Sequence, residues 1–269
     1  MAVADPHRVA YFTRDADGVF RGNDPARGPW SEDHCHAGPV TGLVARAAEA
    51  LAGPEKMLTR LTVDFLRPLP VAGLRVEGTL IRSTRTLAAT RVKVHGPNGG
   101  LCAQATTMHL VRKALAGVPT TPAAPPDFDG AVQGSFSIAE GRHDRPMFAD
   151  FTEIRFPPGE DSRPGPTTLW MRTPRIVQGE DPSPIQALCP LADCGNAISR
   201  NAELSEMGFM NTDLTLQVHR APEGRWFASQ SVSYWEPTGI GMSHSVLFDR
   251  NGPVGAALQT LVLHPVAQR

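Results

Sequence analysis

Apolar and polar residues alternate along several short segments of the chain, and this alternation is typical of half-buried β-strands. It predicts strands in both halves of the sequence, at residues 60–68, 91–95 and 101–112 and at residues 214–220, 226–235, 241–249 and 254–263. The dipeptides Asn98-Gly99 and Asn251-Gly252 each lie between two of these segments and favour tight hairpin turns. We therefore expect antiparallel sheets.

Each set of strands follows a segment that favours a helix. The first is an Ala-rich run that starts after His36 and stops at Gly53-Pro54. The second lies within residues 184–201, where Pro190 indicates either a kink or a fresh start. Because helices and strands do not alternate strictly, the pattern favours the α+β class over a parallel doubly wound sheet.

The two halves repeat this order at a constant spacing. Three pairs of residues share the offset 195 − 42 = 153: Gly42 and Gly195, Arg67 and Arg220, Asn98 and Asn251. We interpret the chain as one structural unit used twice and joined by a Pro/Ala-rich linker. The predicted organisation is an N-terminal domain at 1–113, a linker at 114–145 and a C-terminal domain at 146–269.

Composition excludes several classes of function. The 269 residues are 41% hydrophobic and 20% charged, with a formal net charge of −1, which indicates a globular protein and argues against a nucleic-acid partner. No uninterrupted apolar run reaches the ~18–20 residues of a membrane helix, and the start of the chain has no signal-peptide pattern. Four cysteines without a C-x-x-C motif are typical of a reducing compartment, so we expect a cytoplasmic protein and no membrane partner.

The common motifs of cofactor and nucleophile chemistry are missing from the sequence. It contains no P-loop, no nucleophile elbow and no dinucleotide fingerprint. The segment His34-Cys35-His36 has no second pair of ligands at zinc-like spacing, and we predict no metal site.

Several short segments, taken in order, carry a resemblance to a known family. These are His36-Ala37-Gly38, LTVDFLRP at 61–68, Leu191-Ala192-Asp193, NTDLTLQVHRAP at 211–222 and LQTLVL at 258–263. The sequence resembles the double-hotdog acyl-CoA thioesterases of the thioesterase II type. The resemblance implies two helix-wrapped antiparallel sheets in tandem that form one continuous sheet. It also implies an acyl-CoA substrate, which is hydrolysed to free acid and coenzyme A without a cofactor.

The family places an Asp on the central helix of the C-terminal hotdog, a hydroxyl residue at the start of the next strand and a Gln on the last strand. The matching positions here are Asp193, Asn211 and Gln259, and Asn211 departs from the hydroxyl. The resemblance implies that Asp193 activates the attacking water and that the two amides hold it. His36 and Gly38 are expected to contribute to substrate binding.

The first half lacks an equivalent set of residues. The positions 153 residues earlier are Val40, Leu58 and Thr106, none of which is a carboxylate. We therefore expect one working site in each chain, with the N-terminal hotdog as a scaffold and pocket wall.

Each of these residues also has a structural interpretation. Asp193 could cap a helix that starts after Pro190, Gln259 could lie at an exposed edge, and Asn211 could cap a strand after Gly208. Two other functions stay open: a non-catalytic acyl-CoA-binding protein, or a hydratase or dehydratase, which generally needs a pocket His with an acidic partner. A homo-oligomer is also left open. The sequence does not give the acyl chain length, which the bulky Phe65, Phe209 and Met210 could limit.

Overall fold

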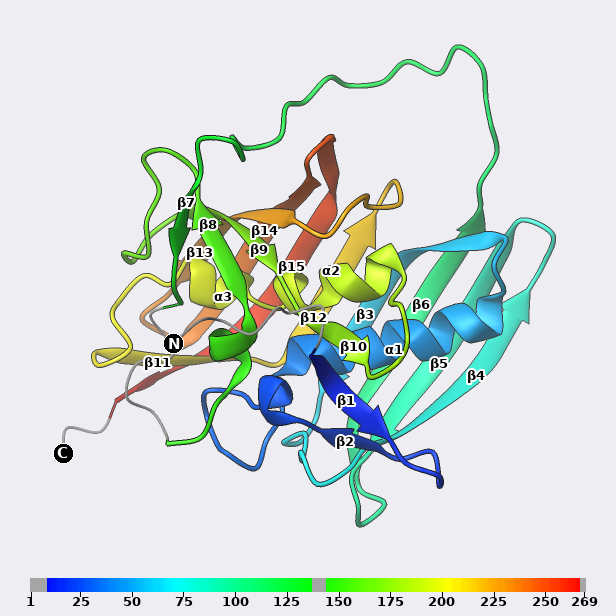
Figure 1. Cartoon of the computed structure of the whole chain (residues 1–269), viewed down its shortest axis with the longest axis horizontal. Coiled ribbons are helices and arrows are strands. Elements are labelled where there is room, and N and C mark those ends of the chain that lie inside the picture. Colours follow the sequence, from blue (N-terminus) through cyan, green and yellow to red (C-terminus); the bar gives the residue numbers. More distant parts are fainter. Residues whose placement is uncertain (1–8, 137–143, 267–269) are drawn as a thin grey trace.

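The structure, a computed structural model, describes residues 9–136 and 144–266, so parts of the predicted linker and of both domain ends lie outside the described residues. Within them, 12 strands form one large sheet with antiparallel neighbours (Figure 1). The spatial order is β4 (Arg75–Ser83), β5 (Leu87–His95), β6 (Leu101–Val111), β3 (Lys56–Phe65), β12 (Asp213–Val218), β15 (Gly252–Pro265), β14 (Ile240–Asp249), β13 (Phe227–Trp235), β9 (Thr167–Arg172), β8 (Glu153–Phe156) and β7 (Val132–Gly134). Strand β11 (Met207–Asn211) pairs with the end of β15.

The helices lie against this sheet, which confirms the predicted α+β class (Figure 1). Helix α1 (Ala37–Ala52) packs on the N-terminal strands, and the helix predicted within 184–201 is divided into α2 (Pro184–Ala192) and α3 (Gly195–Ile198). Pro190 lies inside α2, so it does not mark a helix start. The remaining elements are two short 3₁₀ helices and a three-stranded sheet: η2 (Asp24–Ala26), η4 (Phe148–Phe151), β10 (Arg175–Val177), β1 (Ala10–Arg14) and β2 (Phe20–Gly22).

The strands reproduce the predicted repeat. Adding 153 to the bounds of β5 gives 240–248, and β14 covers these residues and one more. By the same offset, β3 corresponds to β11 and β12 together, β4 to β13, and β6 to β15. The halves meet where β3 pairs with β12, and there Thr62 faces Thr215, its own equivalent in the repeat. Their hydroxyls are 3.2 Å apart. This pairing makes the sheet continuous and places a local two-fold relation at its centre.

The linker region contains structure that the sequence pattern did not predict. After β6 the chain leaves the body as an open arch and returns to β7 (Figure 1). Near its return, Phe128 packs edge-on against Trp170 and Trp226, at 5.2 Å and 5.3 Å between ring centres. Strand β7 lies within the predicted linker and pairs with β8. The predicted domain boundaries therefore stay a proposal.

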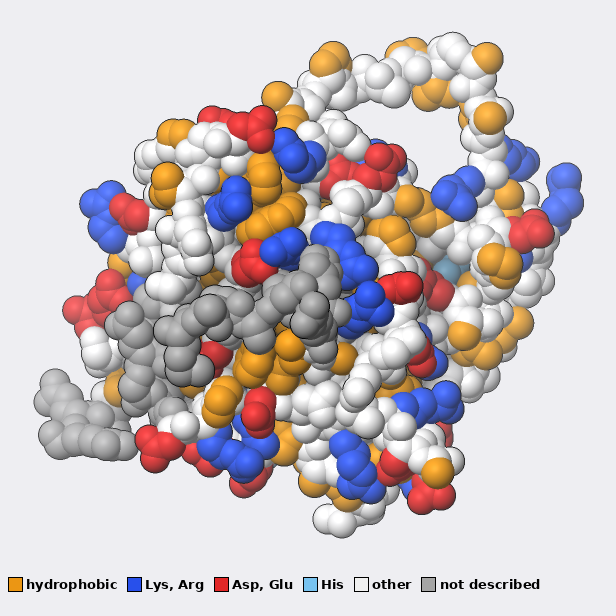
Figure 2. Space-filling view, viewed as in Figure 1, with side chains coloured by type: hydrophobic (Ala, Val, Ile, Leu, Met, Phe, Trp, Pro, Cys, Tyr) orange, Lys and Arg blue, Asp and Glu red, His pale blue; other side chains and the backbone are white. Residues whose placement is uncertain are grey.

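Charged residues of both signs are interspersed over the face seen in Figure 2, around hydrophobic side chains that gather near its centre. The mixture agrees with the net charge of −1 and gives no broad field of one sign. Among the described residues, no helix is long and apolar enough to cross a membrane.

Candidate active site

Asp193 lies directly after the last residue of α2, where its backbone still has helical angles. Its side chain is only 3% exposed, although a carboxylate at a helix end would ordinarily be solvated. The helix before it is buried through Leu188 and Leu191, which face the core. Asp193 therefore caps the C-terminal end of α2 and does not start a helix, and its carboxylate is held inside the protein.

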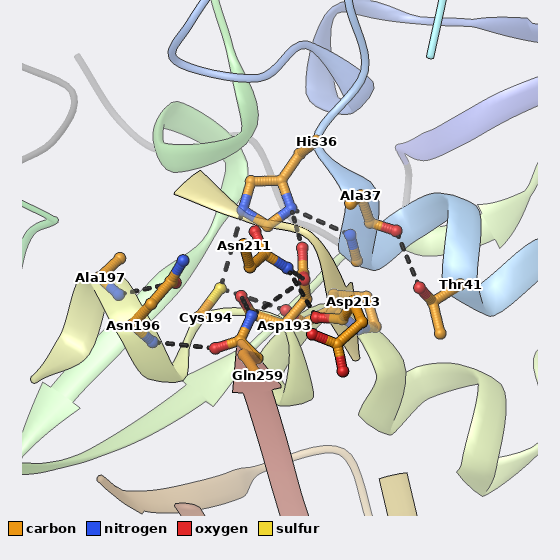
Figure 3. Close-up of polar contacts among 12 residues, drawn as sticks. His36, Ala37, Thr41, Asp193, Cys194, Asn196, Ala197, Asn211, Asp213 and Gln259 are labelled. Carbon is orange, nitrogen blue, oxygen red and sulfur yellow. Dashed lines mark hydrogen bonds and ion pairs between the residues drawn. The ribbon is translucent and has the colours of Figure 1, made fainter. Parts of the chain in front are cut away.

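Two amide side chains hold this carboxylate from the sheet side (Figure 3). Asn211 Nδ2, at the end of β11, donates to Asp193 Oδ1 at 2.8 Å. Gln259 Nε2, on β15, donates to the same oxygen at 3.2 Å and to the Asp193 carbonyl at 2.9 Å. The structure brings these three predicted residues together from separate elements, and both amide donors converge on Oδ1.

Both ends of the Gln259 amide are hydrogen-bonded within the protein. Its Oε1 accepts a hydrogen bond from the Asn196 backbone N–H at 3.0 Å, and its side chain is 2% exposed. Gln259 is therefore not at an exposed edge, and it fixes Asp193 to the start of α3.

His36 contacts the other oxygen of Asp193. It is the residue before α1, and its Nδ1 lies 3.2 Å from Asp193 Oδ2 and 3.1 Å from the Gly38 backbone nitrogen. The first contact needs a proton on Nδ1, whereas the second needs the lone pair of that nitrogen, so only one is made at a time. The ring stacks on Phe148 at 4.2 Å, which fixes its plane.

Gly38 brings the two helices together. A Cβ at this position would lie 2.8 Å from the Pro190 Cα and 3.1 Å from the Asp193 Cβ. Gly38 is absent from the described lining of the cavity, and its N–H already points at His36. The structure gives Gly38 a packing role, and its expected contribution to substrate binding stays a prediction.

A cavity of about 340 Å³ opens beside these residues. It is enclosed by both halves of the chain: from the first half Pro29, Trp30, His34, Cys35, His36, Ala37, Phe65, Leu66, Arg67, Pro68 and Leu69, and from the second Phe136, Met147, Phe148, Ala149, Asp193, Cys194, Asn196, Ala197, Phe209, Met210, Asn211 and Thr212. Asp193, Asn211 and His36 form a polar spot on a mostly apolar wall. Such a site suits an apolar group joined to a reactive polar one.

Cys194 is next to the carboxylate, but its environment opposes nucleophilic chemistry. Burial, and secondarily the charge of Asp193, raises the pKa of the Cys194 thiol well above its ordinary value. The thiol donates to the Pro190 carbonyl at 3.1 Å and lies 4.0 Å from His36 Nε2. The thiolate is the reactive form of cysteine, so this protonated thiol is a poor nucleophile.

Sequence reasoning missed several residues of the site. Phe148 and Met147 come from a segment without periodic pattern, and Asn196 acts through its backbone N–H, so no side-chain signal indicated them. Among the described residues, no group of three or more His, Cys, Asp or Glu side chains could hold a metal ion.

Family comparison covers most of the chain. The model of the acyl-CoA thioesterase N-terminal domain matches residues 26–110, and that of the acyl-CoA thioesterase C-terminal domain matches residues 118–263. A search of curated proteins gave no match.

Solved structures agree on the fold. A protein from Novosphingobium aromaticivorans described as a thioesterase is 20% identical with a TM-score of 0.71, covering 94% of this chain and 98% of its own. An acyl-CoA thioesterase II from Mycobacterium marinum is 17% identical with a TM-score of 0.61, covering 96% of both chains. A protein with a hot dog fold from Alicyclobacillus acidocaldarius is 15% identical with a TM-score of 0.69, covering 94% of this chain and 96% of its own. These matches confirm the expected double hotdog.

The two domain models follow one another in the order that the sequence predicted, and each covers one helix-wrapped half of the sheet. The chain belongs to the acyl-CoA thioesterase family and is a thioester hydrolase with a double-hotdog fold.

Proposed function

We propose that the protein hydrolyses an acyl-CoA thioester, of the fatty acyl class expected from the sequence, with Asp193 as the general base. The observation that carries this proposal is a single buried carboxylate on the wall of an apolar cavity, gripped by Asn211 and Gln259. A base held in one geometry and shielded from bulk water can orient an attacking water molecule.

The reaction follows from this arrangement. Asp193 accepts a proton from water while the water oxygen bonds to the thioester carbonyl carbon, which gives a tetrahedral intermediate. The intermediate collapses, the carbon–sulfur bond breaks, and the proton on Asp193 passes to the leaving thiolate. The products are the free acid and coenzyme A, and Asp193 is regenerated.

The roles of the neighbouring residues differ. Asn211 lines the cavity and donates to Asp193 Oδ1, so it can contact the water as well as the base. Gln259 hydrogen-bonds Asp193 and Asn196 and is not among the described lining residues of the cavity, so we assign it as a positioning residue. His36 lines the cavity within reach of Asp193 Oδ2, where its proton can orient that oxygen.

The developing oxyanion needs donors near the carbonyl. The first turn of α1 is the better placed helix start, because Ala37 lines the cavity and the first N–H groups of a helix have no partner within it. The Asn196 N–H is already engaged by Gln259, whereas the Gly38 N–H, in the same first turn of α1, has no His36 acceptor when the Nδ1 proton is directed at Asp193. We therefore assign the oxyanion to the Ala37 end of α1.

One observation favours a second activity. In the structure His36 has an acidic partner, Asp193, at 3.2 Å in the same cavity. A His and a carboxylate together could add water to the double bond of an enoyl thioester, one taking the proton of water and the other protonating the α-carbon. Such hydration would consume crotonyl-CoA without releasing thiol.

The deciding experiment is thiol release from acyl-CoAs by the wild type and by Asp193→Asn. Proton transfer to a positioned base contributes about 10²–10⁴-fold, so we expect kcat to fall by that factor with an unchanged melting temperature. Asp213→Asn is a matched control, because Asp213 is also beside Asn211 but its Oδ1 accepts from the Thr260 N–H.

The other outcomes are distinct. Full activity in Asp193→Asn would remove Asp193 from the mechanism. Tight acyl-CoA binding without thiol release would favour the non-catalytic acyl-CoA-binding protein, and loss of crotonyl-CoA absorbance without thiol would favour the hydratase. We further propose a cytoplasmic location and a division into two domains joined by a linker at 114–145. We also propose a homo-oligomer, which a measurement of the molar mass in solution by light scattering tests.

A further inference from the structure

The cavity is walled by aromatic rings. Five of its described lining residues are aromatic: Trp30, Phe65, Phe136, Phe148 and Phe209. Rings resist rearrangement because each side chain has only two rotatable bonds and packs against neighbours. Of these rings, Phe148 and Phe209 are buried and form fixed parts of the wall, whereas Trp30 is 46% exposed.

Phe209 closes one side of the cavity. It lies on β11 two residues before Asn211, so both side chains project from the same face of the strand. Its ring is 1% exposed and packs edge-on against Trp30 at 6.0 Å. A ring so close to the residue that holds Asp193 limits how far an acyl chain can extend beyond the scissile bond.

A second ring lies behind Phe209. Trp235 is 5.6 Å from Phe209 between ring centres and is absent from the described lining of the cavity. Its Nε1 is buried without a hydrogen-bond partner in the described part of the chain. Phe209 thus lies between the cavity and Trp235, and a smaller residue would extend the cavity toward the Trp235 ring.

Phe148 forms the wall at His36. It stacks on the His36 ring at 4.2 Å and on Tyr11 at 5.8 Å, and both it and Tyr11 are buried. Phe148 and Phe209 therefore both border the cavity beside the residues of the candidate site, Phe148 at His36 and Phe209 near Asn211.

The cavity volume is also small. About 340 Å³ is at the low end of the ~300–1,000 Å³ typical of ligand pockets. We infer that the site accepts compact acyl groups, short-chain or ring-bearing, and excludes long straight chains, with Phe209 as the residue that sets the limit. This inference rests on the thioesterase function proposed above and narrows its substrate class.

The first test compares kcat/KM for hexanoyl-, phenylacetyl- and palmitoyl-CoA, the last below its micelle concentration. We expect both compact substrates to exceed palmitoyl-CoA by at least ~10-fold, since pocket contacts of this kind discriminate by about 10–200-fold. A palmitoyl-CoA value equal to or above the others would overturn the inference.

The second test changes the ring. Phe209→Leu and the more severe Phe209→Ala should shift the ratio of palmitoyl- to hexanoyl-CoA kcat/KM by at least ~10-fold toward palmitoyl-CoA. Phe227→Leu is the matched control, because Phe227 is equally buried on β13 but is not among the described lining residues. An unchanged ratio in a Phe209 variant that melts cooperatively would remove Phe209 as the limit.

A binding measurement separates this inference from the proposed function. Non-hydrolysable S-hexyl- and S-hexadecyl-CoA thioethers are titrated into the full chain by calorimetry. Tighter binding of the hexyl analogue without any thiol release from the thioesters would sink the proposed hydrolysis but support the compact site. Equal or tighter binding of the hexadecyl analogue would overturn the compact site, whether or not thiol is released.

Discussion

At the scale of single residues, the site depends on one carboxylate and the groups that fix it. Asn211 departs from the hydroxyl that the resemblance implies, and its amide donates to Asp193 Oδ1 at 2.8 Å. A longer side chain with a terminal donor can therefore occupy the same position. With Asn211 at this position, the Asp193 carboxylate still accepts a hydrogen bond from a neighbouring side chain. The proposed chemistry requires this hydrogen bond to the base.

Another buried residue makes folding stability depend on pH. His109 is fully buried on β6, where its Nε2 is 2.8 Å from the Thr107 hydroxyl and its Nδ1 has no partner in the described part of the chain. Burial, and secondarily the charge of Lys56, lowers the pKa of His109 from 6.5 to about 4. The unfolded chain therefore binds this proton more readily than the folded chain.

The sign of the effect follows from this difference. Stability is complete above pH 6.5 and is lost as the pH falls toward 4, by about 3 kcal/mol in total. Urea unfolding between pH 7.5 and pH 4.5 should show this loss, and His109→Leu should have a flatter profile. Parallel profiles for the two proteins would mean that His109 does not contribute.

At the scale of elements, the crossing of α1 and α2 decides where Asp193 lies. Gly38→Ala would place a methyl group 2.8 Å from the Pro190 Cα and 2.9 Å from its carbonyl oxygen. Because both are backbone atoms, the helices must separate, and we expect a loss of about 1–3 kcal/mol together with lower activity. Thermal melting and thiol release measure the two effects.

The control is Gly100→Ala. A Cβ there would meet only the flexible end of Arg67, at 3.5 Å. If Gly38→Ala has the same melting temperature and the same rate of thiol release as this control, the helix crossing tolerates a side chain and does not position the base.

At the scale of the whole molecule, the junction of β3 and β12 joins the two halves. The cavity takes its walls from both halves, so the junction also holds the site together. Thr215 lies in the middle of this junction, opposite Thr62. A proline there would remove a backbone N–H from a strand that has neighbours on both sides.

We therefore expect Thr215→Pro to lose about 1–3 kcal/mol of stability and a corresponding part of the activity. Thr215→Val removes only the hydroxyl contact with Thr62 and should behave nearly like the wild type. Denaturant unfolding followed by fluorescence compares the three proteins. Equal midpoints for the proline and valine variants would show that the junction does not limit stability.

The sequence alone determined the repeated plan of the fold. Strand periodicity and the 153-residue offset depend on local preferences and on which face is buried, and both are written in the order of residues. The family resemblance indicated Asp193, Asn211 and Gln259 by position, and their roles stay a proposal. The small strands β1, β2 and β10 carry too few residues for such a pattern and were not predicted.

Tertiary structure alone decided which groups meet. His36 lies 157 positions before Asp193 in the sequence (193 − 36 = 157), yet the close approach of α1 and α2 at Gly38 places its ring against the carboxylate. The Gln259 amide is hydrogen-bonded to Asp193 and to the Asn196 N–H, which come from a segment far from β15 in the sequence. Phe148 and Phe209 lie in separate segments of the sequence, and only the packing of these segments makes them walls of one cavity. Contacts between distant segments depend on how packed surfaces fit, and local sequence preferences do not encode that fit.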